Sequence, residues 1–195
     1  MKRLSKEIVV QNQPGSPYAT DADFCKIFKN DMNRLYMLSY LLTANGAAAE
    51  QCFVGGLEES QKGNPVFKEW AESWARRTII SNAIRMVNPR AGRDESKNIE
   101  APEIPIPEPL AGVLQLTAFE RFVVVMTMLE GYSERECSLL LHSTAAEVTE
   151  ARTRSLIQLT KTNIGHAEKS GAEKVKKLRD LAAAFGSAFA APATA

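Results

Sequence analysis

Apolar residues recur at steps of three and four along the first third of the chain, once a short stretch with Pro14, Gly15 and Pro17 has passed. This period is typical of an amphipathic α-helix, because residues three and four apart lie on one helix face. With Asp21 or Asp23 as the capping residue, we expect one long helix that ends at Asn45-Gly46. Its apolar face consists of Phe24, Ile27, Phe28, Leu35, Leu38 and Leu42.

A second helix is expected from Ala47 onward, with Cys52, Phe53 and Leu57 on its apolar side. Gly55 and Gly56 follow each other in its interior. Each glycine costs a helix about 1 kcal/mol relative to alanine. The helix should therefore be short, bent or packed very closely against a neighbour.

A third helix is expected to carry three aromatic residues, Phe67, Trp70 and Trp74, near one face and Arg76 roughly opposite. We expect at least one of the tryptophans in the core. The segment from Arg76 to Arg93 contains five arginines and no acidic residue. This uniform positive charge favours contacts with phosphates over a plain solvated face. Asn88-Pro89 should end this helix.

A linker is expected from Asp94 to Gly112, where four prolines oppose regular helix and four glutamates make the segment acidic. After the linker, the same helix-start pattern of a hydroxyl followed three residues later by glutamate occurs three times. Helix ends are expected at Glu130-Gly131 and at the two-residue break His142-Ser143, so the last two helices turn sharply against each other as in a helix-turn-helix. The three capping pairs are Thr117 with Glu120, Ser133 with Glu136, and Thr144 with Glu147.

Several of these motifs together resemble bacterial RNA polymerase sigma factors, especially the small extracytoplasmic-function class. The stretch from Leu116 to Leu159, with Arg121 and the run Glu130-Gly131-Tyr132-Ser133, resembles the fourth region of that family. The run from Leu35 to Thr43, followed by Ala49-Glu50, resembles the start of the second region. The helix from Phe67 to Arg77 resembles the next helix of the same region.

The resemblance implies an all-α fold of two small helical domains joined by a Pro-rich linker, the C-terminal domain a helix-turn-helix. Under this interpretation the chain divides into a flexible N-terminal arm (1–20), a sigma region 2-like domain (21–88), the acidic linker (89–112), a sigma region 4-like domain (113–163) and a basic, then alanine-rich tail (164–195).

The resemblance also implies a function, namely a transcription initiation factor that binds core RNA polymerase and promoter DNA. An anti-sigma factor is a further partner that the resemblance suggests. The N-terminal helices would bind polymerase and the melted downstream promoter element, and the last helix would contact the upstream element. The polymerase contacts expected from it are Glu50, Gln51, Phe53 and Leu57. The DNA contacts expected are Arg76, Arg77, Arg85, Thr144, Thr149, Arg152, Thr153 and Arg154.

Departures from the family pattern keep two alternatives open. In the last helix, Thr149 and Ala151 stand where the family has cations, and Glu147 and Glu150 would repel phosphates. One alternative is therefore a diverged sigma-like regulatory or protein-interaction module without specific promoter recognition. The other is a LuxR-type helix-turn-helix regulator, which the match of the N-terminal half argues against.

Composition and chemistry narrow the class further. A net charge of +1 neither demands nor excludes nucleic acid, so local clustering has to decide. Three scattered cysteines and no long apolar run predict a cytoplasmic protein without a membrane span. Neither histidine has partners at metal-ligand spacing, and no phosphate loop or nucleophile motif occurs. We expect a non-enzyme without cofactor or metal, Cys137 as a buried inert thiol, and His142 as a turn residue.

Overall fold

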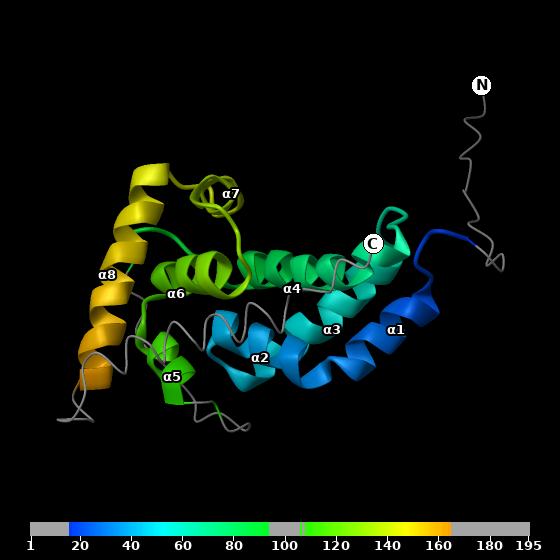
Figure 1. The fold of residues 1–195 in the computed structure, drawn as a ribbon, viewed down its shortest axis with the longest axis horizontal. Coiled ribbons are helices and arrows are strands. Elements are labelled where there is room, and N and C mark those ends of the chain that lie inside the picture. The colour runs from blue at the N-terminus through cyan, green and yellow to red at the C-terminus, as the bar shows by residue number, and fades with distance from the viewer. Residues whose placement is uncertain (1–15, 94–105, 107, 165–195) are drawn as a thin grey trace, which may run out of the picture.

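Helices are the regular elements of the described part of the chain, residues 16–93, 106 and 108–164 of the computed structural model (Figure 1). The predicted all-α class is confirmed for these residues. An isolated β-bridge joins Tyr18 to Phe67. Most of the predicted N-terminal arm, most of the linker and nearly all of the tail lie outside the described residues.

The single long helix expected from Asp21 is wrong, because the structure has two helices there. α1 (Asp21–Asn30) and α2 (Met32–Thr43) meet at Asp31, whose φ of −103° and ψ of 21° leave the helical range. The start of α1 is capped by Thr20, which exchanges hydrogen bonds with Asp23, and neither predicted aspartate is the capping residue itself. The Asp31 side chain makes no capping hydrogen bond to α2, and its carboxylate lies 3.7 Å from Nη1 of Arg34 in the first turn of that helix.

α3 (Gly46–Lys62) is neither short nor broken, and close packing is the explanation for its paired glycines. A Cβ atom on Gly56 would lie 2.7 Å from Cγ1 of Ile79, so only glycine lets α3 approach this closely. The neighbour is α4 (Ala71–Val87), which follows a 3-10 turn, η1 (Lys68–Trp70). The predicted end of this helix is confirmed, since Asn88 adopts a left-handed conformation with φ 48°.

The end of the expected linker is helical, which corrects the prediction that its prolines exclude helix. α5 (Glu108–Ala111) includes Pro109 in its first turn, where the missing proline N–H has no intrahelical partner to lose. η2 (Gly112–Gln115) continues it. Leu110, Val113 and Leu114 are buried in the core.

The three predicted capping pairs are confirmed in the C-terminal half. Each hydroxyl accepts from the glutamate backbone N–H, and each carboxylate accepts from the hydroxyl residue. They start α6 (Ala118–Val124), α7 (Glu134–Leu140) and α8 (Ala145–Ile164). α6 continues into a π turn, η3 (Val125–Leu129), and the chain then turns at Gly131 with φ 73°. His142 is a turn residue, as expected, with φ 50°.

One hydrophobic core runs through both halves of the chain. Its members extend from Phe28 and Leu42 to Phe122 and Val148, and α2 packs directly against α6. Arg121 is buried between the halves and donates from Nε to the Leu42 carbonyl oxygen at 3.2 Å. In this structure α1–α4 and α5–α8 lie against each other, with α2 in contact with α6 (Figure 1). The division into two bundles and a tether stays a prediction.

Candidate nucleic-acid interface

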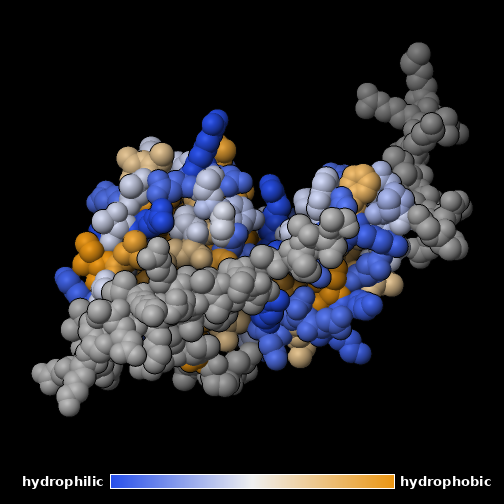
Figure 2. All heavy atoms as spheres, viewed as in Figure 1, coloured by the Kyte–Doolittle hydropathy of each residue, from blue (hydrophilic) through white to orange (hydrophobic). Residues whose placement is uncertain are grey.

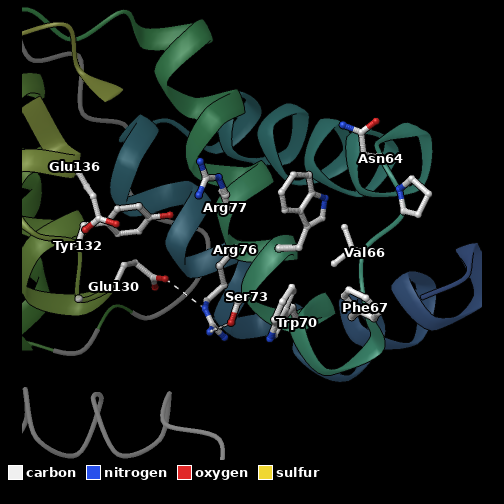
Figure 3. Close-up of a pocket in the computed structure, with 13 residues that line it drawn as sticks. Asn64, Val66, Phe67, Trp70, Ser73, Arg76, Arg77, Glu130, Tyr132 and Glu136 are labelled. Carbon is white, nitrogen blue, oxygen red and sulfur yellow. Dashed lines mark hydrogen bonds and ion pairs between the residues drawn. The ribbon is translucent and has the colours of Figure 1, made fainter. Parts of the chain in front are cut away.

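A cleft of about 630 Å³ lies where α4 faces the turn between η3 and α7 (Figure 3). One wall comes from the loop before α4 and from α4 itself, and the other comes from the segment that ends η3 and starts α7. Both halves of the chain therefore build it. The residues that form the two walls are Asn64, Pro65, Val66, Phe67, Trp70, Ser73, Trp74, Arg76, Arg77, Glu130, Gly131, Tyr132 and Glu136.

An aromatic cluster forms the outer end of this cleft. The rings of Tyr18 and Phe67 stack with centroids 4.9 Å apart, and Trp70 meets Phe67 edge-on at 5.3 Å. Trp70 is 59% exposed and Trp74 is half-buried, so the expectation that at least one of the tryptophans lies in the core is wrong. Trp70 lies in the 3-10 turn η1, before the α-helical period begins, so the face calculated from the sequence does not apply to it.

Backbone pairing holds the aromatic cluster in place. The Ala19 N–H donates to the Val66 carbonyl at 2.7 Å, and the Lys68 N–H donates to the Pro17 carbonyl at 2.9 Å. The last residues of the expected flexible arm are thus fixed against the loop before α4. Exposed aromatic rings on a fixed backbone offer flat surfaces on which unpaired bases can stack.

Trp74 lies deeper and is half-buried rather than a full core residue. Its indole N–H is covered and has no hydrogen-bond acceptor among the described residues. Buried indole N–H groups usually donate a hydrogen bond. The inner cleft therefore holds a hydrogen-bond donor that has no acceptor among the described residues.

Two of the three predicted α4 arginines line the cleft, and the third does not. Arg76 and Arg77 lie in its wall (Figure 3), although Arg76 was expected opposite the aromatic residues. Arg85 lies farther along α4, where its Nη1 donates to Oε1 of Glu59 at 3.3 Å and its Nη2 donates to Oδ1 of Asn82 at 2.7 Å. Only Arg76 and Arg77 are therefore placed to act together with the aromatic cluster.

Glu130 is a residue of this site that the sequence reasoning did not assign to it. Its carboxylate Oε2 lies 3.4 Å from Nε of Arg76, and its side chain is only 4% exposed. Burial raises the pKa of Glu130, and the nearby Arg76 opposes that shift without cancelling it. The Glu-Gly-x-Ser run identified this position as a helix end, but no local signal indicated its partner on α4.

The predicted contacts on α8 are engaged with acids of the chain itself. Thr149 donates to Oε2 of Glu134 at 2.9 Å, and Arg152 lies 2.9 Å from Oε1 of the same carboxylate. These two bonds hold the pKa of Glu134 below its usual range. Arg154 bridges Glu120 on α6 at 3.2 Å and Glu150 at 2.6 Å.

The remaining residues of the predicted recognition surface divide between solvent and core. Thr144 is exposed and caps α8, and Thr153 is exposed and donates to the Thr149 carbonyl. Ala151 is fully buried against the core. A cation at position 151 would point into the protein. The absence of the family's cation there therefore does not bear on contacts with a DNA groove.

The four predicted polymerase contacts on α3 do not form one exposed patch. Glu50 and Gln51 are exposed, whereas Leu57 and Phe53 are half-buried, and Phe53 meets Phe28 edge-on at 5.2 Å. Val54, which sequence reasoning missed, is 52% exposed one helical turn after Glu50. The spacing of four residues was the signal that could have found it.

Cys137 is buried as expected, and burial raises its pKa to about 11, far from a reactive thiolate. Within residues 16–93, 106 and 108–164, no cluster of three or more histidine, cysteine or acidic side chains is arranged to hold a metal ion. No helix in that same part is long and apolar enough to cross a membrane.

Comparison with known proteins yields distant structural likenesses and no sequence match. No protein-family model matches the chain, and no curated protein sequence matches it. Among solved structures, it is similar to the sigma factor RpoE in a co-crystal structure with the anti-sigma factor NepR from Bartonella quintana. The likeness has a TM-score of 0.43 at 16% sequence identity and covers 74% of this chain and 99% of that chain.

Proposed function

We propose that this chain is a sigma-like transcription initiation factor that binds core RNA polymerase and promoter DNA in the cytoplasm, without catalysis of its own. The sequence motifs that resemble the second and fourth sigma regions suggest the class. The observation that carries the proposal is the cleft, in which the exposed Trp70 and Phe67 lie beside Arg76 and Arg77.

This combination suits single-stranded DNA of a melted promoter. Stacking of a base on an aromatic ring contributes about 1 to 3 kcal/mol and tolerates any base. Arginines along the same groove neutralise backbone phosphates and release counterions, which makes binding fall steeply with salt. Trp70 would supply the stacking surface and Arg77, which is exposed, the phosphate contact.

For the upstream promoter element, we propose that α7, the turn at His142 and α8 act as a helix-turn-helix. Thr149 and Thr153 would face the groove from α8, because both are exposed. Polymerase would bind at the exposed stretch of α3 that contains Glu50, Gln51 and Val54. An anti-sigma factor is a further partner that the family resemblance suggests.

The experiment is run-off transcription with reconstituted bacterial core polymerase, on genomic fragments that this complex selects. Trp70→Ala combined with Arg77→Ala should reduce run-off product at least about tenfold, since it removes one stacked base and one phosphate contact. Lys29→Ala is the control, because Lys29 is an exposed cation of α1 outside the cleft and outside α7 and α8. Equal transcription by both variants would refute the role given to the cleft.

A second candidate is a diverged sigma-like module that binds polymerase or another protein without specific promoter recognition. The observation in its favour is that Arg152 and Arg154 are already paired with Glu134, Glu120 and Glu150. Co-purification with core polymerase together with no promoter-directed run-off would select this candidate over the first.

A further inference from the structure

The ion pair between Arg76 and Glu130 joins the two halves of the chain inside the cleft (Figure 3). Arg76 comes from α4, and Glu130 follows η3 in the C-terminal half. Nη2 of Arg76 also donates to Oγ of Ser73, so the guanidinium is oriented by its own helix. The Glu130 carboxylate therefore pairs with an arginine that lies in the same cleft as the aromatic cluster.

A carboxylate and a phosphate can compete for one arginine, because each presents a pair of anionic oxygens to the guanidinium fork. Glu130 takes Nε of Arg76, one of the donors a nucleic-acid phosphate would use. A strand that stacks on Trp70 and contacts Arg77 therefore meets Glu130 at the next cation along α4. It gains the full charge of Arg76 only if Glu130 leaves, because the carboxylate neutralises that charge while it stays.

The contact is of a kind that a phosphate can displace. The Glu130 side chain is almost completely buried, and its pKa is raised because the loss of hydration outweighs the attraction of Arg76. Arg85 on the same helix behaves differently, since its hydrogen bond with Glu59 dominates and raises the pKa of Arg85. The pair inside the cleft also has the looser geometry, since Nε of Arg76 lies 3.4 Å from the carboxylate whereas Arg85 donates two hydrogen bonds to Glu59.

We propose that Glu130 is an internal competitor for nucleic-acid phosphate, which occupies Arg76 while the cleft is empty and is displaced when single-stranded DNA binds. The proposal rests on the proposed function of the cleft. It adds a threshold to that function, because only a ligand that supplies both a stacked base and a phosphate replaces the carboxylate. It also couples binding to the packing of the two halves, since displacement breaks an ion pair between them.

The test measures fluorescence anisotropy of a short labelled single-stranded DNA with the full chain at low salt. Glu130→Gln should bind about fivefold tighter than the wild type, because the carboxylate charge that competes with phosphate at Arg76 is removed. The slope of log Kd against log salt should be the same in both proteins, because displacement of the carboxylate gives the wild-type complex the same phosphate contact. Glu69→Gln is the control, since it removes an exposed charge just before α4 outside the cleft wall.

A further variant tests whether the gain depends on Arg76. In the wild-type background Arg76→Ala would also leave the Glu130 carboxylate without its cation, so the comparison is made in the glutamine background. In the Glu130→Gln background, Arg76→Ala should abolish the gain. Thermal unfolding of each variant confirms that it is folded.

The outcomes separate this proposal from the function on which it rests. If the wild type binds and Glu130→Gln is no tighter than Glu69→Gln, internal competition is overturned while the cleft keeps its role. If Arg76→Ala leaves the gain of Glu130→Gln intact, the proposal is likewise overturned. If no variant binds DNA even at low salt, the proposed function of the cleft fails and this inference fails with it.

Discussion

Arg121 caps the end of a helix that lies 79 residues earlier in the chain. Its Nε donates to the Leu42 carbonyl oxygen at 3.2 Å, and its Nη1 donates to the Leu116 carbonyl at 3.3 Å. Leu42 belongs to the last turn of α2, whose carbonyl groups have no partner within the helix. A cation there also meets the negative end of the helix dipole. The buried arginine thus ties α6 to α2 through the backbone.

Arg121→Met should lower the free energy of unfolding by about 2 to 4 kcal/mol. The variant keeps the apolar stem but leaves two buried carbonyl groups without donors, at about 1 to 3 kcal/mol each. Urea denaturation measures the effect. Arg135→Met, at an exposed position, should change stability by less than about 0.5 kcal/mol. Equal effects would show that Arg121 does not hold the halves together.

Gly56→Ala should destabilise the protein by about 1 to 3 kcal/mol, despite the higher helix propensity of alanine. The added Cβ would lie 2.7 Å from Cγ1 of Ile79, so α3 and α4 must separate or Ile79 must leave its rotamer. Gly46→Ala is the matched control on the same helix. No atom lies within 4 Å of its Cβ position, and the change should be neutral or stabilising by about 0.5 kcal/mol. A stabilising Gly56→Ala would contradict the close packing.

Two turn residues with positive φ, His142 and Gly131, should change the unfolding free energy in opposite directions when the first is replaced by glycine and the second by alanine. His142 has φ 50°, so His142→Gly should raise the unfolding free energy by about 0.5 to 1 kcal/mol. Gly131 has φ 73° with open space around it, so Gly131→Ala should lower that energy by about 1 kcal/mol through backbone strain alone. Thermal unfolding followed by circular dichroism checks both. A shift of the same sign in the two variants would refute the argument.

Local chemistry explains what sequence reasoning predicted well here. A capping box such as Thr144 with Glu147 needs only four consecutive residues, so the starts of α6, α7 and α8 could be identified without the fold. The same holds for the left-handed turn at Gly131. The break at Asp31 was missed because the apolar period continues across it, and a single polar residue gives no period of its own.

Long-range relations explain most of what was missed. The partner of Glu130 is on α4, and the partner of Arg121 is on α2, more than 50 residues away in each case. Periodicity within one helix says which face is apolar but not which other helix covers it. The exposure of Trp70 was missed for a local reason. Trp70 lies in a 3-10 turn, so the helical period of α4 does not predict which way its side chain faces.

Glu150→Gln should strengthen binding of duplex DNA at low salt by about two- to fivefold, equivalent to about 0.5 to 1 kcal/mol. The Glu150 side chain is 66% exposed on α8 and pairs with Arg154, so its neutralisation removes a repulsive charge and releases part of that arginine for phosphate. Glu58→Gln, which removes a similar exposed i,i+4 pair with Lys62 on α3, serves as the control. Equal gains in both variants would mean that α8 does not face the duplex.

Glu130→Gln should make the protein more stable than the wild type at neutral pH, with a difference that disappears in acid. Burial raises the pKa of Glu130 in the folded state above its ordinary value of 4.5, so the folded state holds this proton more tightly than the unfolded state does. Below pH 4.5 the residue is protonated in both states and costs nothing. As the pH rises through the folded-state pKa, the wild type loses stability that the glutamine variant, with no proton to release, keeps. Urea denaturation at a series of pH values measures this difference. A variant less stable than the wild type at pH 7 would mean that the ion pair with Arg76 stabilises the fold, and Glu130 would then be too strongly held to yield to a phosphate.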